Sequence, residues 1–282
     1  MKTILAARNS IIATTYSLLF ILSCFTSAHA TNIDTLSEPF NGRFYFYWGY
    51  NRGIFSASDI HVKGPGYDFT VYNVKSKDHA ENPSLVYLNP KLFTIPQFNV
   101  RLGYHITKRW AISLGYDHMK YVMQNNRMAN VSGVINAAAS KKYAGTYLQT
   151  PVYLDTSFLK FEHTDGLNIV TIDAEYLLPI WKHKRNKWRL EATIGTGGVW
   201  IIPRSDVRVL SKGLNNRFHM AGYTWTGKAG FRINGYKRFF FQMETRGGYI
   251  SLPSVLVAND APDIINHNFT FLEFTGMLGI RF

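Results

Sequence analysis

The chain has 282 residues, 15% aromatic side chains, a mean hydropathy of −0.11 and a formal net charge of +13. This length allows one large or two modest domains. The low hydropathy excludes a bundle of transmembrane helices, and a single cysteine, Cys24, excludes a disulfide framework.

The first thirty residues have the parts of a secretory signal. A basic start precedes an apolar stretch over residues 11–25, and Ala28-His29-Ala30 forms an Ala-x-Ala cleavage site. We predict a cleaved signal over residues 1–30, followed by a short periplasmic segment over residues 31–42. Because Cys24 lies inside the signal and its preceding residues fit a lipid-acceptor pattern poorly, the processed chain is expected to lack thiol chemistry.

From residue 43 onward, apolar and polar residues alternate in eight segments. In chain order these are 43–51, 97–106, 109–122, 168–178, 188–200, 218–234, 239–249 and 269–282. Alternation with a period of two indicates a strand with one apolar and one polar face. A tilted strand needs roughly 9–11 residues to cross a membrane, and these segments are about that long or longer. We therefore predict an all-β fold, an up-and-down antiparallel transmembrane β-barrel of eight strands over residues 43–282.

The connections between these segments alternate between short and long. The long ones cover about 55–96, 123–167, 201–217 and 250–267. Such alternation is typical of barrels with short periplasmic turns and long extracellular loops. Ten strands is the competing count, because Tyr67 to Lys75 and Thr146 to Leu154 also alternate. Those two segments would either add a hairpin or extend the wall above the membrane.

The repeated pattern and the terminal aromatic residue Phe282 resemble the small bacterial outer-membrane barrels of the outer-membrane protein A and W type. The resemblance covers residues 43–282 and concerns architecture more than activity. It implies residence in the outer membrane of a Gram-negative bacterium. It also implies insertion by periplasmic chaperones and the barrel assembly machinery, with Phe282 as the terminal assembly signal.

The positive charge is concentrated in the three short turns. They carry eight cations and no acid: Lys108, Arg109, Lys182, Lys184, Arg185, Lys187, Lys237 and Arg238. Cations beside aromatic residues suit phosphate headgroups, so we expect outer-membrane lipids, including lipopolysaccharide, as partners. The alternative is that these turns are charged simply because they are solvated. No continuous basic stripe is present, and no nucleic-acid partner is predicted.

The predicted inward-facing positions hold six acids and six bases. The acids are Asp117, Asp173, Glu175, Glu191, Glu244 and Glu273, and the bases are Arg101, Arg189, Lys228, Arg232, Arg246 and Arg281. An eight-stranded barrel is just wide enough for side chains to fill it. Unpaired charges would be costly to bury there. We therefore predict a lumen closed by a network of salt bridges.

One segment resembles part of a catalytic motif. Outer-membrane lipid A deacylases carry a Phe-x-His-x-Ser-Asn stretch followed by a later Glu, and here Phe161 and His163 match its first two conserved positions. Asp165 occupies the serine position, and Glu175 follows at a different spacing. His163, Asp165 and Glu175 are thus weak candidates for an acyl hydrolase that lacks its expected nucleophile.

The sequence favours a structural or surface-binding scaffold whose long loops contact an unknown surface ligand. A lipid A or phospholipid hydrolase using His163 is the first alternative, and a carrier of small apolar molecules is the second. No cofactor is predicted. No metal site is predicted either, because the His and Asp pairs in the first long loop lack a third ligand at a fixed spacing.

Overall fold

The computed structural model describes residues 42–81, 96–183, 188–213, 217–235, 238–257 and 263–282. All of them belong to one compact unit, residues 39–282. The predicted signal over residues 1–30 and nearly all of the predicted periplasmic segment lie outside the described residues, as do parts of two cationic turns, 184–187 and 236–237. No helix in the described ranges is long and apolar enough to cross a membrane.

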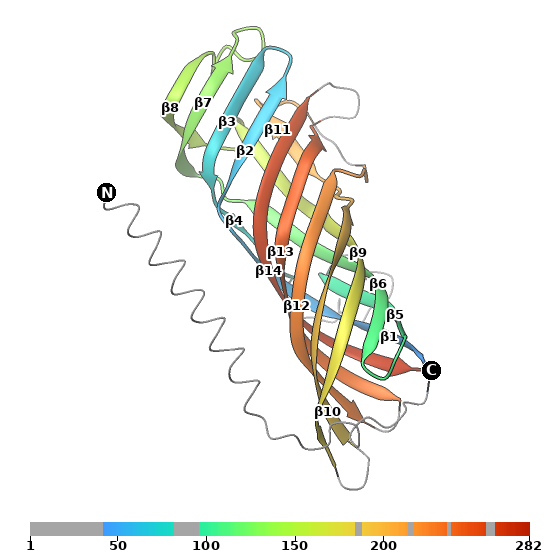
Figure 1. Cartoon of the computed structure of the whole chain (residues 1–282). Coiled ribbons are helices and arrows are strands. Elements are labelled where there is room, and N and C mark those ends of the chain that lie inside the picture. Colours follow the sequence, from blue (N-terminus) through green and yellow to red (C-terminus); the bar gives the residue numbers. More distant parts are fainter. Residues whose placement is uncertain (1–41, 82–95, 184–187, 214–216, 236–237, 258–262) are drawn as a thin grey trace, which may run out of the picture. The chain divides into compact units, whose positions relative to one another are not determined.

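Eight strands form a closed antiparallel ring (Figure 1). In order around the ring they are β1 (Phe44–Phe55), β5 (Phe98–His105), β6 (Trp110–Met123), β9 (Leu159–Lys182), β10 (Trp188–Ile201), β12 (Gly222–Gly235), β13 (Phe239–Leu256) and β14 (Ile264–Arg281). The first and last strands close the ring, in a register that runs from Tyr45 opposite Arg281 to Phe55 opposite Phe271. The predicted eight-stranded barrel is confirmed, and each of its strands overlaps one of the eight alternating segments, although β9, β13 and β14 extend well beyond them.

The alternating pattern places apolar side chains on the outer wall. Along β14 exposed and buried residues alternate almost without interruption. Outward-facing Leu278 is 70% exposed and Trp225 is 69% exposed, although both are large and apolar. A soluble monomer rarely exposes a contiguous apolar surface of this size, so the wall is built to face lipid.

Aromatic residues mark both ends of the apolar wall on β10, where Trp188 and Trp200 are exposed. Trp200 is opposite Val170 on β9, and Leu190 is opposite Trp181. Aromatic girdles of this kind lie at the two membrane interfaces of outer-membrane barrels. The membrane-spanning part of β9 is therefore about residues 170–181, and the strand continues well beyond it.

The described parts of the two longest predicted loops are largely β-sheet. Four strands continue the wall beyond the ring, in the order β14–β2–β3–β7–β8: β2 (Ser58–Gly64), β3 (Tyr67–Val74), β7 (Arg127–Ile135) and β8 (Gly145–Leu154). Strand β2 pairs with β14 where β1 has ended, and we call these four strands the upper sheet. The Tyr67 and Thr146 segments thus extend the wall, and β2 and β7 are additional strands. Two short strands complete the structure, β4 (Ser76–Lys77) beside β6 and β11 (Asp206–Val209) beside β9.

The upper sheet shares a hydrophobic core with the neighbouring ends of the ring strands. Its inward-facing side chains, among them Ile60, Val71 and Val131, are fully buried with Phe158 and with Ile265 of β14 in one continuous apolar cluster. Burial of this kind gains roughly 25 cal/mol per Å² of apolar surface. The upper sheet is therefore a folded extension of the barrel, not a set of separate loops.

Strand β8 forms the outer edge of the upper sheet, and β7 is its ladder partner among the described residues. Edge strands of this type are open to pairing with other chains. Here Pro151 removes one backbone donor, and Gln149 has a positive φ of 53° that disturbs the edge. Both features discourage a further strand from adding to this edge.

Candidate functional site

The candidate site in the barrel lumen begins with Arg101 on β5. Its guanidinium forms two parallel bonds to Asp117 on β6, Nη1 to Oδ1 at 2.6 Å and Nη2 to Oδ2 at 2.7 Å. A Cβ atom at Gly115 would collide with the Arg101 side chain, so glycine is needed at that position to seat the arginine. The sequence therefore provides both the charged side chain, Arg101, and the space that it occupies beside Gly115.

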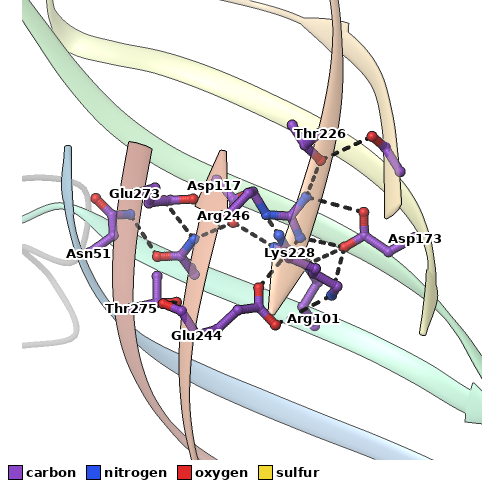
Figure 2. A network of polar contacts seen from close by, with 12 residues as sticks. Asn51, Arg101, Asp117, Asp173, Thr226, Lys228, Glu244, Arg246, Glu273 and Thr275 are labelled. Atoms are coloured by element: carbon purple, nitrogen blue, oxygen red, sulfur yellow. Dashed lines mark hydrogen bonds and ion pairs between the residues drawn. The ribbon is translucent and has the colours of Figure 1, made fainter. Parts of the chain in front are cut away.

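Asp173 on β9 is the centre of this network (Figure 2). Its carboxylate accepts hydrogen bonds from Arg246 Nη2 at 2.5 Å and from Lys228 Nζ at 3.0 Å, and Arg101 Nε lies 3.3 Å away. All four side chains are buried. The single negative charge of Asp173 is thus shared among three cations, each of which comes from a different strand. Such charge-assisted bonds are stronger than neutral ones.

Lys228 connects this centre to two further acids. Its ammonium donates to Glu175 at 2.8 Å and lies 3.6 Å from Glu244. Arg232 lies 3.6 Å from Glu175 and donates from Nε to Gln242 at 2.6 Å. The network therefore extends along the lumen through alternating charges and amides.

The remaining acids and bases lie at the two ends of the network. Towards β14, Asn99 donates to Glu273 at 2.9 Å and also bonds Asp117. Towards the periplasmic end, Glu191 lies 3.1 Å from Arg189 and 3.4 Å from Arg281. The structure thus places all twelve charged residues named from the sequence inside the lumen, where each has at least one polar partner.

Apolar layers lie at both ends of the charged layer. The periplasmic one contains Tyr45, Tyr47, Phe240 and Met277, and the other is the core of the upper sheet. Arg232 also lies 4.5 Å from the Phe240 ring centroid, a cation–π contact that joins two of the layers. Among the described residues, buried side chains therefore form three successive layers inside the barrel, one charged and two apolar.

The three weak catalytic candidates do not come together. His163 is 0% exposed and its Nδ1 is 2.8 Å from Ser205 Oγ. Asp165 has a side chain that is 56% exposed and lies 3.6 Å from Arg204. Glu175 belongs to the charged lumen network. A hydrolytic triad needs its acid next to the histidine, and this arrangement does not provide it.

Sequence reasoning missed both serine–histidine contacts in this region, that of Ser205 with His163 and a second one at His267. His267 Nε2 lies 2.7 Å from Ser58 Oγ and 3.4 Å from the Tyr121 hydroxyl. The Phe161 ring lies about 5 Å from both imidazoles, at 4.9 Å and 5.1 Å between centroids. These side chains form a buried aromatic and histidine layer, which we call the histidine layer, above the membrane-spanning part of the barrel.

Burial dominates the electrostatics of the histidine layer. It lowers the pKa of His163 and of His267 to about 3, because a charged imidazole loses its hydration there. Both histidines are therefore neutral at neutral pH. The alternation of β9 and β14 shows that both point inward, but it does not indicate their partners, which are distant in sequence.

Metal-binding groups are not evident in the part of the chain that the structure describes. It contains no group of three or more His, Cys, Asp or Glu side chains arranged to hold a metal ion. His118, which has outward-facing parity on β6, is buried, stacks on Phe98 at 5.3 Å and hydrogen-bonds Asn168 Oδ1 at 2.7 Å. Its role in these contacts is structural.

Comparison with known proteins found no matching family model and no matching curated protein. Several solved outer-membrane proteins are similar in structure. The outer membrane protein OprG from Pseudomonas aeruginosa is 10% identical, with 87% of this chain and 98% of that chain covered and a TM-score of 0.40. Neisserial surface protein A is 9% identical, with coverages of 87% and 100% and a TM-score of 0.36. The N-terminal β-barrel domain of OprF from P. aeruginosa is 9% identical, with coverages of 84% and 99% and a TM-score of 0.28.

Proposed function

We propose that this protein spans the bacterial outer membrane as a closed barrel and acts as a scaffold that presents its upper sheet at the cell surface. The observation that carries the proposal is the layered arrangement of buried side chains inside the barrel. Around Asp173, three cations lie within 3.3 Å of one buried carboxylate, and apolar layers lie above and below them. An eight-stranded barrel packed in this way leaves little room for a water-filled path.

The upper sheet supports the scaffold part of the proposal. The outer face of β7 and β8 exposes several apolar side chains, Met128, Val134, Leu148 and Tyr153, and Leu148 is 82% exposed. These residues lie beyond the lipid-facing wall, where such exposure is typical of a binding surface. Reaching this location requires the periplasmic chaperones and the barrel assembly machinery.

Planar-bilayer recording tests the closed lumen. The purified protein is expected to produce no stable conductance steps under conditions where an open porin produces them. A large, stable conductance from the wild-type protein would overturn the proposal. The same preparation should need detergent to remain dispersed, which tests the membrane-spanning part separately.

Cysteine labelling in intact cells tests the location of the upper sheet. The chain has no cysteine other than Cys24 in the predicted signal, so a single introduced cysteine gives a clean readout. We expect a membrane-impermeant maleimide to label Leu148→Cys on β8 but not Met243→Cys on the lipid-facing wall. Labelling of both or of neither would contradict the proposed orientation.

One specific contact favours a second candidate function, acyl hydrolysis. Ser205 Oγ lies 2.8 Å from His163 Nδ1, which is within the hydrogen-bonding distance of a serine nucleophile and its base. Both side chains are buried, so the residues that cover them would have to move for a lipid to reach them. The mass of lipid A from cells with the wild-type protein, with His163→Ala and with no protein decides the matter. Identical masses in all three would rule this function out.

A further inference from the structure

Arg52 is an unusual residue on the lipid-facing wall. It lies on β1 between outward-facing Tyr50 and Ile54, and its ladder partner on β14 is Phe274, which is also exposed. A charge at this position would be costly in the centre of the hydrocarbon and much less so near an interface. Its depth in the membrane therefore decides how it can be accommodated.

The outward-facing residues of β14 indicate that depth. Phe274 and Leu272 are apolar, whereas the next outward positions are Thr270 and Asn268. The wall thus changes from apolar to polar within one or two positions of Arg52, on the side of the upper sheet. Arg52 lies at the border between acyl chains and headgroups in the outer leaflet.

The positive charge of Arg52 is not neutralised by the protein residues that the structure describes. Its guanidinium donates a long hydrogen bond of 3.4 Å to the carbonyl oxygen of Glu81, and none of its nitrogens lies within ion-pair distance of a described carboxylate. The Glu81 carboxylate is instead 3.2 Å from Lys120. Arg52 therefore keeps a full charge and unused donors at an interface rich in anionic groups.

A groove of about 300 Å³ lies directly beside Arg52, on the seam where β1 and β14 close the ring. Tyr50, Met243 and Phe274 line it with apolar surface, and Gly276 forms part of its floor. A Cβ atom at Gly276 would meet nothing closer than 4.0 Å, so the missing side chain leaves open space there. The groove is therefore shaped by the absence of a side chain at Gly276.

We infer that this seam binds a phosphate-bearing lipid of the outer leaflet, with a phosphate on the Arg52 guanidinium and an acyl chain in the groove over Gly276. An arginine fork suits phosphate geometry, and the apolar groove suits the hydrocarbon that such a lipid carries. The inference rests on the proposed function, because it requires that the wall face lipid. It adds a defined lipid site to that function.

Binding of lipid A to the purified protein in detergent, followed by native mass spectrometry, tests the site. A charge-assisted hydrogen bond is the main contact removed in Arg52→Gln, so the dissociation constant should rise about 10-fold. Gly276→Leu fills the groove and should also weaken binding, and Arg52→Lys should retain part of it. Inorganic phosphate at the same concentration should not displace lipid A, because it lacks the acyl chain.

Two matched variants serve as controls. Gly227→Leu adds the same side chain to another outward-facing glycine with open space around it, and Arg43→Gln removes an exposed arginine near the periplasmic end. Both should bind lipid A like the wild type. The lipid site would be overturned if Arg52→Gln and Gly276→Leu bound lipid A with wild-type affinity. It would also be overturned if the control variants lost as much affinity as these two, or if phosphate displaced lipid A. A wild-type chain that stays dispersed without detergent would instead overturn the membrane-spanning barrel itself.

Discussion

Replacing Asp173 by Asn should strongly destabilise the barrel. Three cations lie 2.5–3.3 Å from its carboxylate, all of them buried. At an effective dielectric constant near 20, each such contact is worth about 5 kcal/mol of Coulomb energy, most of which desolvation offsets. Removing one member of a buried ion pair typically costs about 3–5 kcal/mol, and we expect a loss of this size in the free energy of unfolding.

The assay is reversible unfolding in urea with the barrel in phospholipid vesicles, followed by tryptophan fluorescence. Asp206→Asn is the control, because Asp206 forms a partly exposed ion pair with Lys160 and should lose only about 0–1 kcal/mol. The double variant Asp173→Asn with Lys228→Met removes one charge of each sign and should recover part of the loss. If Asp173→Asn costs no more than Asp206→Asn, the reasoning about a shared carboxylate is refuted.

Three further predictions concern other parts of the chain. Gly115→Leu should prevent the barrel from closing, because the leucine side chain would occupy the space of Arg101. The folded fraction is measured from the gel mobility of unheated samples. A wild-type folded fraction in this variant would contradict the prediction. Burial lowers the pKa of His163 and His267 below that of the unfolded chain, so the unfolded chain binds more protons in acid. Stability should therefore fall as pH drops from about 6.5 to about 3, and the double variant His163→Gln, His267→Gln should flatten that slope in unfolding measured against pH. An unchanged slope would show that other groups control it. Pro151→Val should restore an edge donor on β8 and increase self-association in light scattering, whereas an unchanged mass would show that Pro151 does not protect the edge.

The strands of the ring were predictable because alternation is a local property. Each strand presents one face to lipid and one to the lumen, so parity alone places Asp173 and Arg246 inside. Their contact was not predictable, because the two residues are 73 positions apart and the stagger of the closed ring determines which side chains meet. The same limit applies to Ser205 beside His163.

The upper sheet was only partly predictable. The Tyr67 and Thr146 segments alternate over eight or more residues, whereas β2 has only Ile60 and Val62 opposite Asp59, His61 and Lys63. Such a short pattern does not distinguish a strand from a polar loop. Strand β2 pairs with β3 and with the far end of β14, and no local pattern indicates the second pairing.

Strand β14 pairs with β13 along one edge, and with β1 and then β2 along the other. Neither the cylinder nor its distal extension can therefore close without β14, whichever strands have already paired. Because β14 pairs with strands from both ends of the chain, assembly of the barrel depends on contacts between residues far apart in sequence, which are the slow ones to form.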